Sequence, residues 1–198
     1  AQYGVGRGMY TGDTTIGHAT AYCQALEALA GCAVPPRAQA LRAIALELER
    51  LANHTGDLGA LAGDIGFLPT ASYCGRLRGD FLNMTALLCG NRFGRGLVRP
   101  GGVAYDMDSA ILDALRSRLD ATFRDVAGAV NLLWDTPSVL ARFENTGALT
   151  LETAITLGLV GPAARASGRN LDVRRDYSTG AYATTAIPVA LQDSGDVF

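Results

Sequence analysis

The chain has 198 residues, of which 48% are hydrophobic and 18% are charged, with a formal net charge of −2. This length and apolar content suffice for one sizeable core, so we expect one domain with at most a small addition. The acidic balance excludes nucleic acid as a partner, because nucleic-acid-binding domains carry a basic surface. The low share of charged residues predicts that part of the apolar surface meets a partner protein.

No stretch approaches the roughly 20 uninterrupted apolar residues of a membrane-spanning helix, and no charged and then apolar leader opens the sequence. We therefore expect a soluble, non-secreted chain without a membrane span. The cysteines are widely spaced among apolar residues, which predicts buried reduced thiols and neither a disulfide framework nor a metal knuckle. They are Cys23, Cys32, Cys74 and Cys89.

Residues 1–12 contain four glycines with little apolar periodicity and are predicted to form a loop. Apolar residues then recur at helical spacing, which predicts helices over about 14–30, 36–63, 69–88 and 108–134. A proline pair separates the first two of these helices, because proline suits a first turn and not a helix interior. Four long helices with short connections indicate a bundle, so the predicted fold class is mainly α.

The pattern becomes irregular after the fourth helix. Two short helices are predicted, and Thr150 has the residue type that begins the second of them. Residues 160–198 are richer in Gly, Ser, Thr and Tyr, and β-prone runs at about 182–189 predict a small irregular β segment. We therefore divide the domain into a helical bundle core over 1–159 and this β appendage.

Four strings occur in a fixed order along the chain: PPRAQ at 35–39, ERLANH at 49–54, RPGGV at 99–103 and ASGRNLDVR at 166–174. Together they resemble the large-subunit family that is shared by complex I, as its 49-kDa or D subunit, and membrane-bound nickel-iron hydrogenases, including the formate hydrogenlyase large subunit. The resemblance covers nearly the whole chain, and members of the family continue beyond its last residue.

In the hydrogenase branch, the resemblance implies a CxxCxxxH motif whose thiolates hold nickel and iron. This sequence has Thr11 and Thr14 at the two cysteine positions and keeps the histidine as His18. Soft thiolates suit these metals and hydroxyls do not replace them, so we expect no metal to be bound by this chain. In the family, the second cysteine pair lies beyond the position of Phe198, so whether a longer parent protein has this pair stays open.

In the complex I branch, the resemblance implies that a quinone occupies the vacated metal cavity, close to an iron-sulfur cluster held by a small partner subunit. It further implies a quinone-binding tyrosine four residues after the histidine, which here is Tyr22. A phenol donates a hydrogen bond to a quinone carbonyl, and an imidazole at His18 supplies a proton. The alternative is that both residues form a satisfied polar pair, with Asp13 and Thr14 capping the helix.

Further polar residues admit two interpretations each. Arg50 and His54 lie one helical turn apart, which predicts a buried polar relay or ordinary hydrogen bonding between helices. Arg37 and Arg99 belong to segments that the resemblance places toward the partner subunit, where positive charge raises the potential of a cluster. Their alternative is a solvated or capping role.

The predicted function is that of an electron-transfer subunit in a complex I-like or energy-converting hydrogenase-like oxidoreductase, inactive alone. It would shape a quinone or similar acceptor cavity, within an NAD-linked assembly of a small iron-sulfur subunit and membrane subunits. The expected location is the cytoplasmic face of a bacterial or archaeal cell membrane. The alternatives are a catalytically silent docking subunit and an atypical nickel-iron hydrogenase large subunit.

Overall fold

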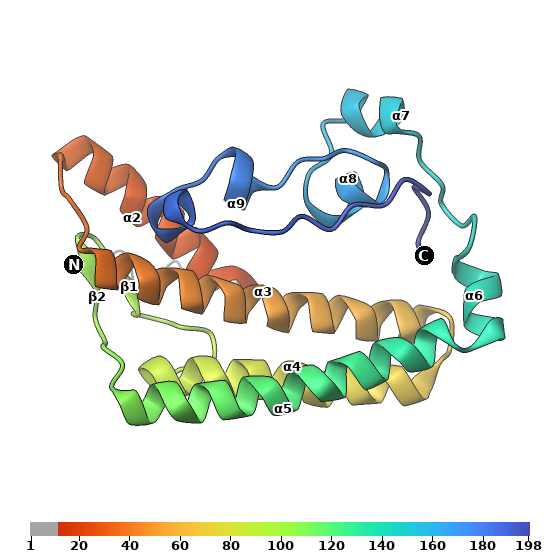
Figure 1. Cartoon of the computed structure of the whole chain (residues 1–198), viewed down its shortest axis with the longest axis horizontal. Coiled ribbons are helices and arrows are strands. Elements are labelled where there is room, and N and C mark those ends of the chain that lie inside the picture. The colour runs from red at the N-terminus through yellow and green to blue at the C-terminus, as the bar shows by residue number, and fades with distance from the viewer. Residues whose placement is uncertain (1–11) are drawn as a thin grey trace. The chain divides into compact units, whose positions relative to one another are not determined.

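The computed structural model describes residues 12–198, and the chain forms two compact units (Figure 1). The first unit ends at Leu132, and the second is Leu133–Phe198. Each unit has its own set of helices, and strands are confined to one short hairpin within the described residues. The prediction of a mainly α chain is confirmed.

The first unit is built from long helices. Its elements are η1 (Gly12–Thr14), α2 (Thr15–Ala30), α3 (Pro36–Asp64), α4 (Leu68–Cys89), β1 (Val98–Arg99), β2 (Gly102–Val103) and α5 (Ser109–Trp134), which ends just beyond the unit. Each predicted long helix is confirmed to within one residue at either end. In the described part of the chain, no helix is both long and apolar enough to cross a bilayer.

Local chemistry explains where these helices begin and end. Pro36 occupies the first turn of α3, where its missing N–H costs no hydrogen bond. Gly31 and Gly90 end α2 and α4 in the left-handed conformation, with φ of 60° and 72°. The carboxylate of Asp108 accepts a hydrogen bond of 2.8 Å from the amide of Ile111 and so caps α5.

Helices α3 and α4 pack closely along their lengths (Figure 1). A Cβ atom at Gly59 would lie 2.9 Å from the Cβ of Cys74, so glycine permits this approach. The core beneath contains Phe81 and Met84 of α4 and Leu115 of α5, whereas Leu77 packs in a second cluster with Cys74 and Ala129. The two helices can therefore approach closely at Gly59.

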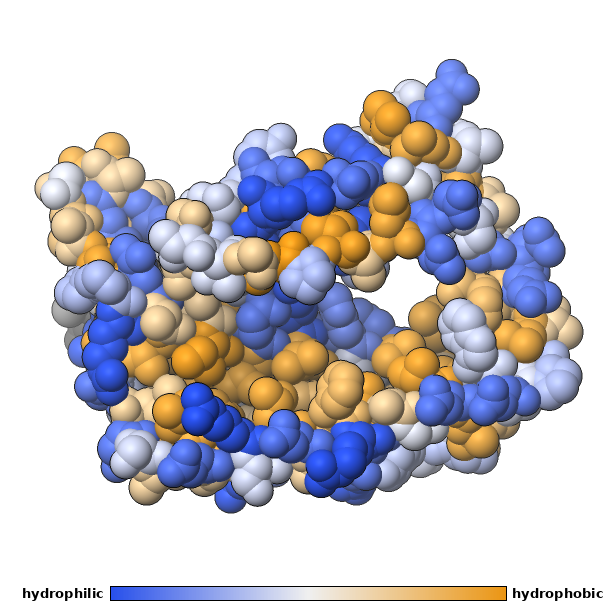
Figure 2. All heavy atoms as spheres, in the orientation of Figure 1, coloured by the Kyte–Doolittle hydropathy of each residue, from blue (hydrophilic) through white to orange (hydrophobic). Residues whose placement is uncertain are grey.

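Apolar side chains also reach the surface of the first unit, and Figure 2 shows hydrophobic residues between hydrophilic ones along the long helices. Exposed large examples are Leu29, Leu61, Leu68, Tyr73, Tyr105, Phe123 and Leu132. This exposure agrees with the low charge content of the sequence.

The second unit contains only short helices: α6 (Pro137–Phe143), α7 (Leu151–Thr156), α8 (Gly161–Ala166), α9 (Val173–Asp176) and η2 (Gly180–Thr184). The two predicted short helices are confirmed as α6 and α7. The hydroxyl of Thr150 caps α7 by accepting a 3.2 Å hydrogen bond from the amide of Thr153. The structure divides the chain at 132/133, whereas the predicted division at 159/160 stays a prediction.

The predicted β segment near the end of the chain is wrong. Residues 182–184 belong to η2, and 185–189 form no strand in the described structure. The hydroxyls of Thr184 and Thr185 both donate to the carbonyl of Ala181, at 3.3 and 2.8 Å. Such local bonds favour a turn, so the β-branched threonines stabilise a 3₁₀ helix here.

Candidate functional site

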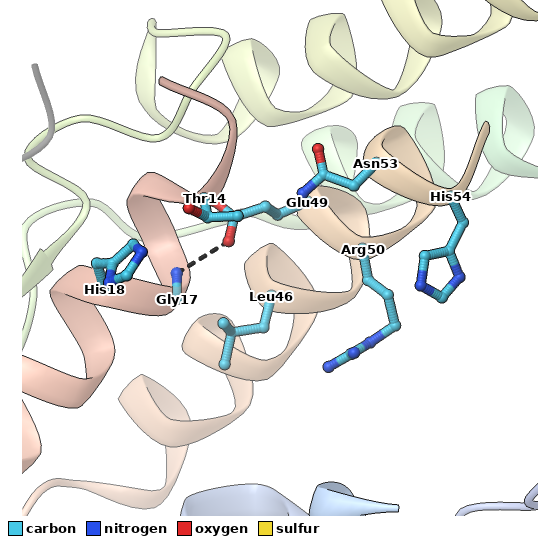
Figure 3. Close-up of a pocket in the computed structure, with 8 residues that line it drawn as sticks. All are labelled: Thr14, Gly17, His18, Leu46, Glu49, Arg50, Asn53 and His54. Carbon is cyan, nitrogen blue, oxygen red and sulfur yellow. Dashed lines mark hydrogen bonds between the residues drawn. The ribbon is translucent and has the colours of Figure 1, made fainter. Parts of the chain in front are cut away.

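A polar cavity of about 410 Å³ opens between the beginning of α2 and the middle of α3 (Figure 3). Its lining combines imidazole, guanidinium, amide and carboxylate groups with one large apolar side chain. The lining residues are Thr14, Gly17, His18, Leu46, Glu49, Arg50, Asn53 and His54. Four of the residues singled out in the sequence therefore meet here, namely Thr14, His18, Arg50 and His54.

The cavity is organised by a carboxylate that sequence reasoning did not select. Glu49 Oε2 accepts a 2.7 Å hydrogen bond from the amide of Ile16, and Oε1 accepts a 2.9 Å bond from the amide of Gly17. Within the described chain, Thr14 precedes α2 without a side-chain capping hydrogen bond. The predicted capping by the residues before α2 is therefore replaced by a cap from α3.

Burial raises the pKa of Glu49 above its usual value, although the amide bonds of Ile16 and Gly17 oppose the shift. The charge of His18 also favours the ionised carboxylate. A partly buried acid in a cavity that is also lined by two imidazoles and a guanidinium can take up and release a proton.

The polar residues of α3 surround this carboxylate. Arg50 is half-buried, and its Nε lies 3.3 Å from Glu47 Oε2. Asn53 donates a 3.1 Å hydrogen bond to the carbonyl of Asp13, whose carboxylate pairs with Arg78 of α4 at 2.7 Å. His54 is exposed at the same cavity. Three elements, η1, α3 and α4, are thus joined by polar bonds around the site.

The structure separates the predicted pair of His18 and Tyr22. His18 is exposed and lines the cavity, whereas Tyr22 is half-buried, packs against the hydrophobic core and is absent from the cavity lining. Side chains four residues apart share a helix face. On this face of α2, however, His18 lies at the cavity and Tyr22 already contacts the core. Their quinone-binding roles stay predictions.

Arg37 and Arg99 also lie apart from the cavity lining. Arg37 is exposed and forms a 2.8 Å ion pair with Asp106 and a 2.7 Å hydrogen bond with the carbonyl of Met107. Arg99 is exposed on β1. A partner interface at these arginines stays a prediction.

The family resemblance assigns the two nickel-ligand positions to Thr11 and Thr14, and hydroxyls are not the soft ligands that suit nickel. Thr11 lies outside the described residues, and Thr14 offers a hydroxyl. Among the described residues, no three or more His, Cys, Asp or Glu side chains are grouped to hold a metal ion. Cys23, Cys74 and Cys89 are buried, which raises the pKa of each thiol, whereas the prediction of burial is wrong for Cys32, which is exposed.

A buried ion pair connects the RPGGV string to the helices. Arg42 Nη2 lies 2.6 Å from Glu27 Oε1, and Nη1 lies 3.1 Å from Oε2, with both side chains 6–7% exposed. The same guanidinium donates to the carbonyls of Arg99 and Gly102, and Glu27 accepts from the amide of Gly101. This pairing lowers the pKa of Glu27.

The hairpin itself turns at Pro100 and Gly101. Gly101 has φ of +82°, which suits the third position of a type II turn after proline. The sequence analysis did not predict this ion pair. The feature that could have indicated it is the charged residue Arg42 next to the apolar stripe of α3.

In the second unit, the ASGRNLDVR string folds around Asp172, which is 3% exposed. Its carboxylate accepts from the amide of Arg174 at 2.9 Å and from the guanidinium of Arg174 at 2.8 Å, while Arg165 lies 3.8 Å away. The Arg174 guanidinium holds the pKa of Asp172 well below its usual range. This string therefore acts as a compact structural element around one buried carboxylate.

The helical fold and the positions of the four strings on α3, the hairpin and the α8–α9 region define a chain of the large-subunit class. A family model described as "Respiratory-chain NADH dehydrogenase, 49 Kd subunit" matches residues 64–198, more than half of the chain. The chain belongs to this family.

Curated relatives agree with this assignment. NADH-quinone oxidoreductase subunit 4 of Thermus thermophilus is 36% identical over 184 residues, which cover 93% of this chain and 45% of that protein. The carbon monoxide-induced hydrogenase of Rhodospirillum rubrum is 34% identical over 182 residues, covering 91% of this chain and 50% of that protein. The chain spans about half the length of the curated relatives it matches.

A solved structure has the same fold. It is that of the membrane-bound sulfane sulfur reductase, an archaeal respiratory membrane complex. The matching chain is 25% identical with a TM-score of 0.77, and the match covers 84% of this chain and 45% of that one.

Proposed function

We propose that this chain is part of the D-type subunit of a complex I-like respiratory oxidoreductase and that its α2–α3 cavity holds a quinone or similar acceptor headgroup. Electrons would come from an iron-sulfur cluster in a small partner subunit, and membrane subunits would anchor the assembly at the inner face of the cell membrane. The observation that carries the proposal is the meeting of His18, Arg50 and His54 in one cavity.

The chemistry of the cavity suits such a ligand. A quinone ring has two carbonyl acceptors and flat apolar faces, and the lining supplies N–H donors on Arg50 and Asn53 beside the apolar Leu46. Its volume of about 410 Å³ lies within the usual range for small-molecule sites. Reduction of the ring takes two electrons and two protons, and the imidazoles of His18 and His54 can deliver protons.

Titration of the chain with a short-chain ubiquinone analogue tests the proposal. We expect His18→Ala and Arg50→Ala each to weaken binding about tenfold, as loss of one hydrogen bond implies. Tyr22→Phe, compared with Tyr105→Phe in an exposed loop, tests the predicted tyrosine role separately. Absence of binding by the unmodified chain would overturn the proposal. It would favour the alternative that the chain belongs to a catalytically silent docking subunit.

The hydrogenase alternative is tested by metal analysis of the complete complex. Iron and sulfide without nickel would support the proposal, because the cluster would belong to a partner. Stoichiometric nickel would overturn it.

A further inference from the structure

The start of α2 depends on a residue that is more than 30 positions away in sequence. The amides of Ile16 and Gly17 are among those that a helix leaves without internal partners, and the carboxylate of Glu49 accepts hydrogen bonds from both. A negative charge at this end of a helix is also favoured by the helix dipole. Figure 3 shows the Glu49 side chain reaching from α3 to the backbone of α2.

Gly17 leaves space for this contact. A Cβ atom at this position would lie 3.2 Å from Glu49 Oε1, which is tighter than ordinary van der Waals contact. The next residue in the chain is His18, whose side chain lines the cavity. The position of this imidazole is therefore tied to the Glu49 carboxylate through the backbone of one residue.

We propose that Glu49 is the positioning residue of the cavity: it holds the first turn of α2 and His18 against α3, and proton uptake by Glu49 releases one of its two amide bonds. This inference deepens the proposed function and rests on it for the identity of the ligand. A protonated carboxyl has one oxygen that carries the proton as a donor, so it no longer matches two N–H donors. Protonation of Glu49 and loosening of the first turn of α2 would therefore occur together.

Several charged groups surround this carboxylate. His18 on α2 acts on its charge at a distance, and Arg50 and His54 line the same cavity from α3. The ion pair of Asp13 with Arg78 connects η1 to α4 and is joined to α3 through Asn53. Burial of Glu49 outweighs the favourable effects of His18 and Arg50, so its protonation occurs at higher pH than for an exposed glutamate.

Glu49→Gln is the direct test, because it replaces one of the two accepting oxygens by an NH2 group, which cannot accept a hydrogen bond from a backbone N–H. Asp57→Asn, an exposed acid on the same helix, is the matched control. We expect amide hydrogen exchange at Ile16 or Gly17 to accelerate by roughly tenfold or more in Glu49→Gln and to be unchanged in Asp57→Asn. Gly17→Ala, which crowds the carboxylate, should act in the same direction.

A structural cap without a proton role is distinguished by pH. In the unmodified chain, the amide resonances of Ile16 and Gly17 should shift with the titration of the Glu49 carboxyl carbon, and affinity for the ubiquinone analogue should change over the same interval. Glu49→Gln should remove this pH-dependent change in affinity. Amide resonances of Ile16 and Gly17 that do not shift as Glu49 titrates would overturn the inference. This measurement uses the unmodified chain, so it decides the matter even if Glu49→Gln fails to fold.

The two proposals fail separately. Absence of quinone binding with intact coupling of Glu49 to the amides overturns the proposed ligand and supports the positioning role. Quinone binding with the same pH profile in Glu49→Gln overturns the positioning role.

Discussion

The two units of this chain achieve order in different ways. The first has long helices around buried apolar clusters, and polar contacts in it join residues far apart in sequence, such as Arg42 with Glu27 and Glu49 with Ile16. The second has helices of at most seven residues, too short to persist by themselves in water. There the chain is held by local capping and by bonds between loops.

Gly195 illustrates the second mode. Its amide donates to the carbonyl of Ala166 at 2.8 Å, and its carbonyl accepts from the amide of Leu149 at 3.0 Å. With φ of +72° and the Leu149 backbone against it, this position has no room for a side chain. The comparison indicates that the first unit is sensitive to buried charge and core shape, and the second to individual hydrogen bonds.

The largest effect is expected for the buried ion pair of the first unit. Glu27→Ala leaves the guanidinium of Arg42 buried without its carboxylate, which should lower the free energy of unfolding by about 3–5 kcal/mol. Urea denaturation followed by far-UV circular dichroism measures this. Glu47→Ala, which removes a half-exposed partner of Arg50, should cost no more than about 0.5 kcal/mol. Equal losses in both variants would contradict the distinction.

A somewhat smaller loss should follow from filling the space at Gly94. This residue has φ of +68°, and an added Cβ would lie 2.6 Å from the Cδ1 of Ile16 on α2. Gly94→Ala should cost about 3 kcal/mol from overpacking and backbone strain combined. Gly96 has φ of +77° with open space around it, so Gly96→Ala isolates the strain, at about 1–2 kcal/mol. Matching denaturation midpoints for the two variants would exclude the contact with Ile16 as the cause.

In the second unit, Asp172→Asn should cost about 2 kcal/mol, because it removes charge-assisted hydrogen bonds to Arg174. The folded-state pKa of Asp172 lies below the unfolded value, so its contribution is complete above about pH 4 and is lost as pH falls toward the folded-state pKa. The fluorescence of Trp134, whose ring centroid lies 4.2 Å from that of Phe198, reports on this unit.

The matched control is Asp193→Asn, at an exposed position of the same unit. Unfolding of each variant is followed by Trp134 fluorescence at several pH values. The difference in the free energy of unfolding between the two variants should shrink as pH falls below about 4, because Asp172 becomes protonated. A difference that stays constant down to the lowest measurable pH would contradict the assigned role of this carboxylate.

The smallest effect is expected on the surface of the first unit. Arg76 pairs with Asp80 at 3.0 Å and Asp125 at 2.8 Å and lies over the ring of Tyr73, but all of these groups are substantially exposed. Arg76→Ala should leave the denaturation midpoint unchanged within error at moderate salt, because solvent and ions screen such pairs. A clear, salt-sensitive shift would show that this cluster joins α4 to α5 more firmly than its exposure indicates.

The sequence by itself determined the long helices, because apolar residues at a 3.6-residue spacing, proline at Pro36 and terminal glycines act locally. It also identified His18, Arg50 and His54 as residues of interest and, through its ordered strings, the family. It did not determine the end of the chain, where β-branched threonines bond to Ala181 and form η2 in place of a strand.

Only the tertiary structure decided which of these side chains share a cavity. Tyr22, one turn from His18, packs into the core, whereas His54, thirty-six positions farther along the chain, lines the same cavity as His18. Glu49 begins the ERLANH string, but nothing in the sequence pointed to a role for its carboxylate, since a glutamate on a helix is usually a solvated residue. Its role arises because packing brings α3 to the beginning of α2, where two backbone amides lack partners within their own helix.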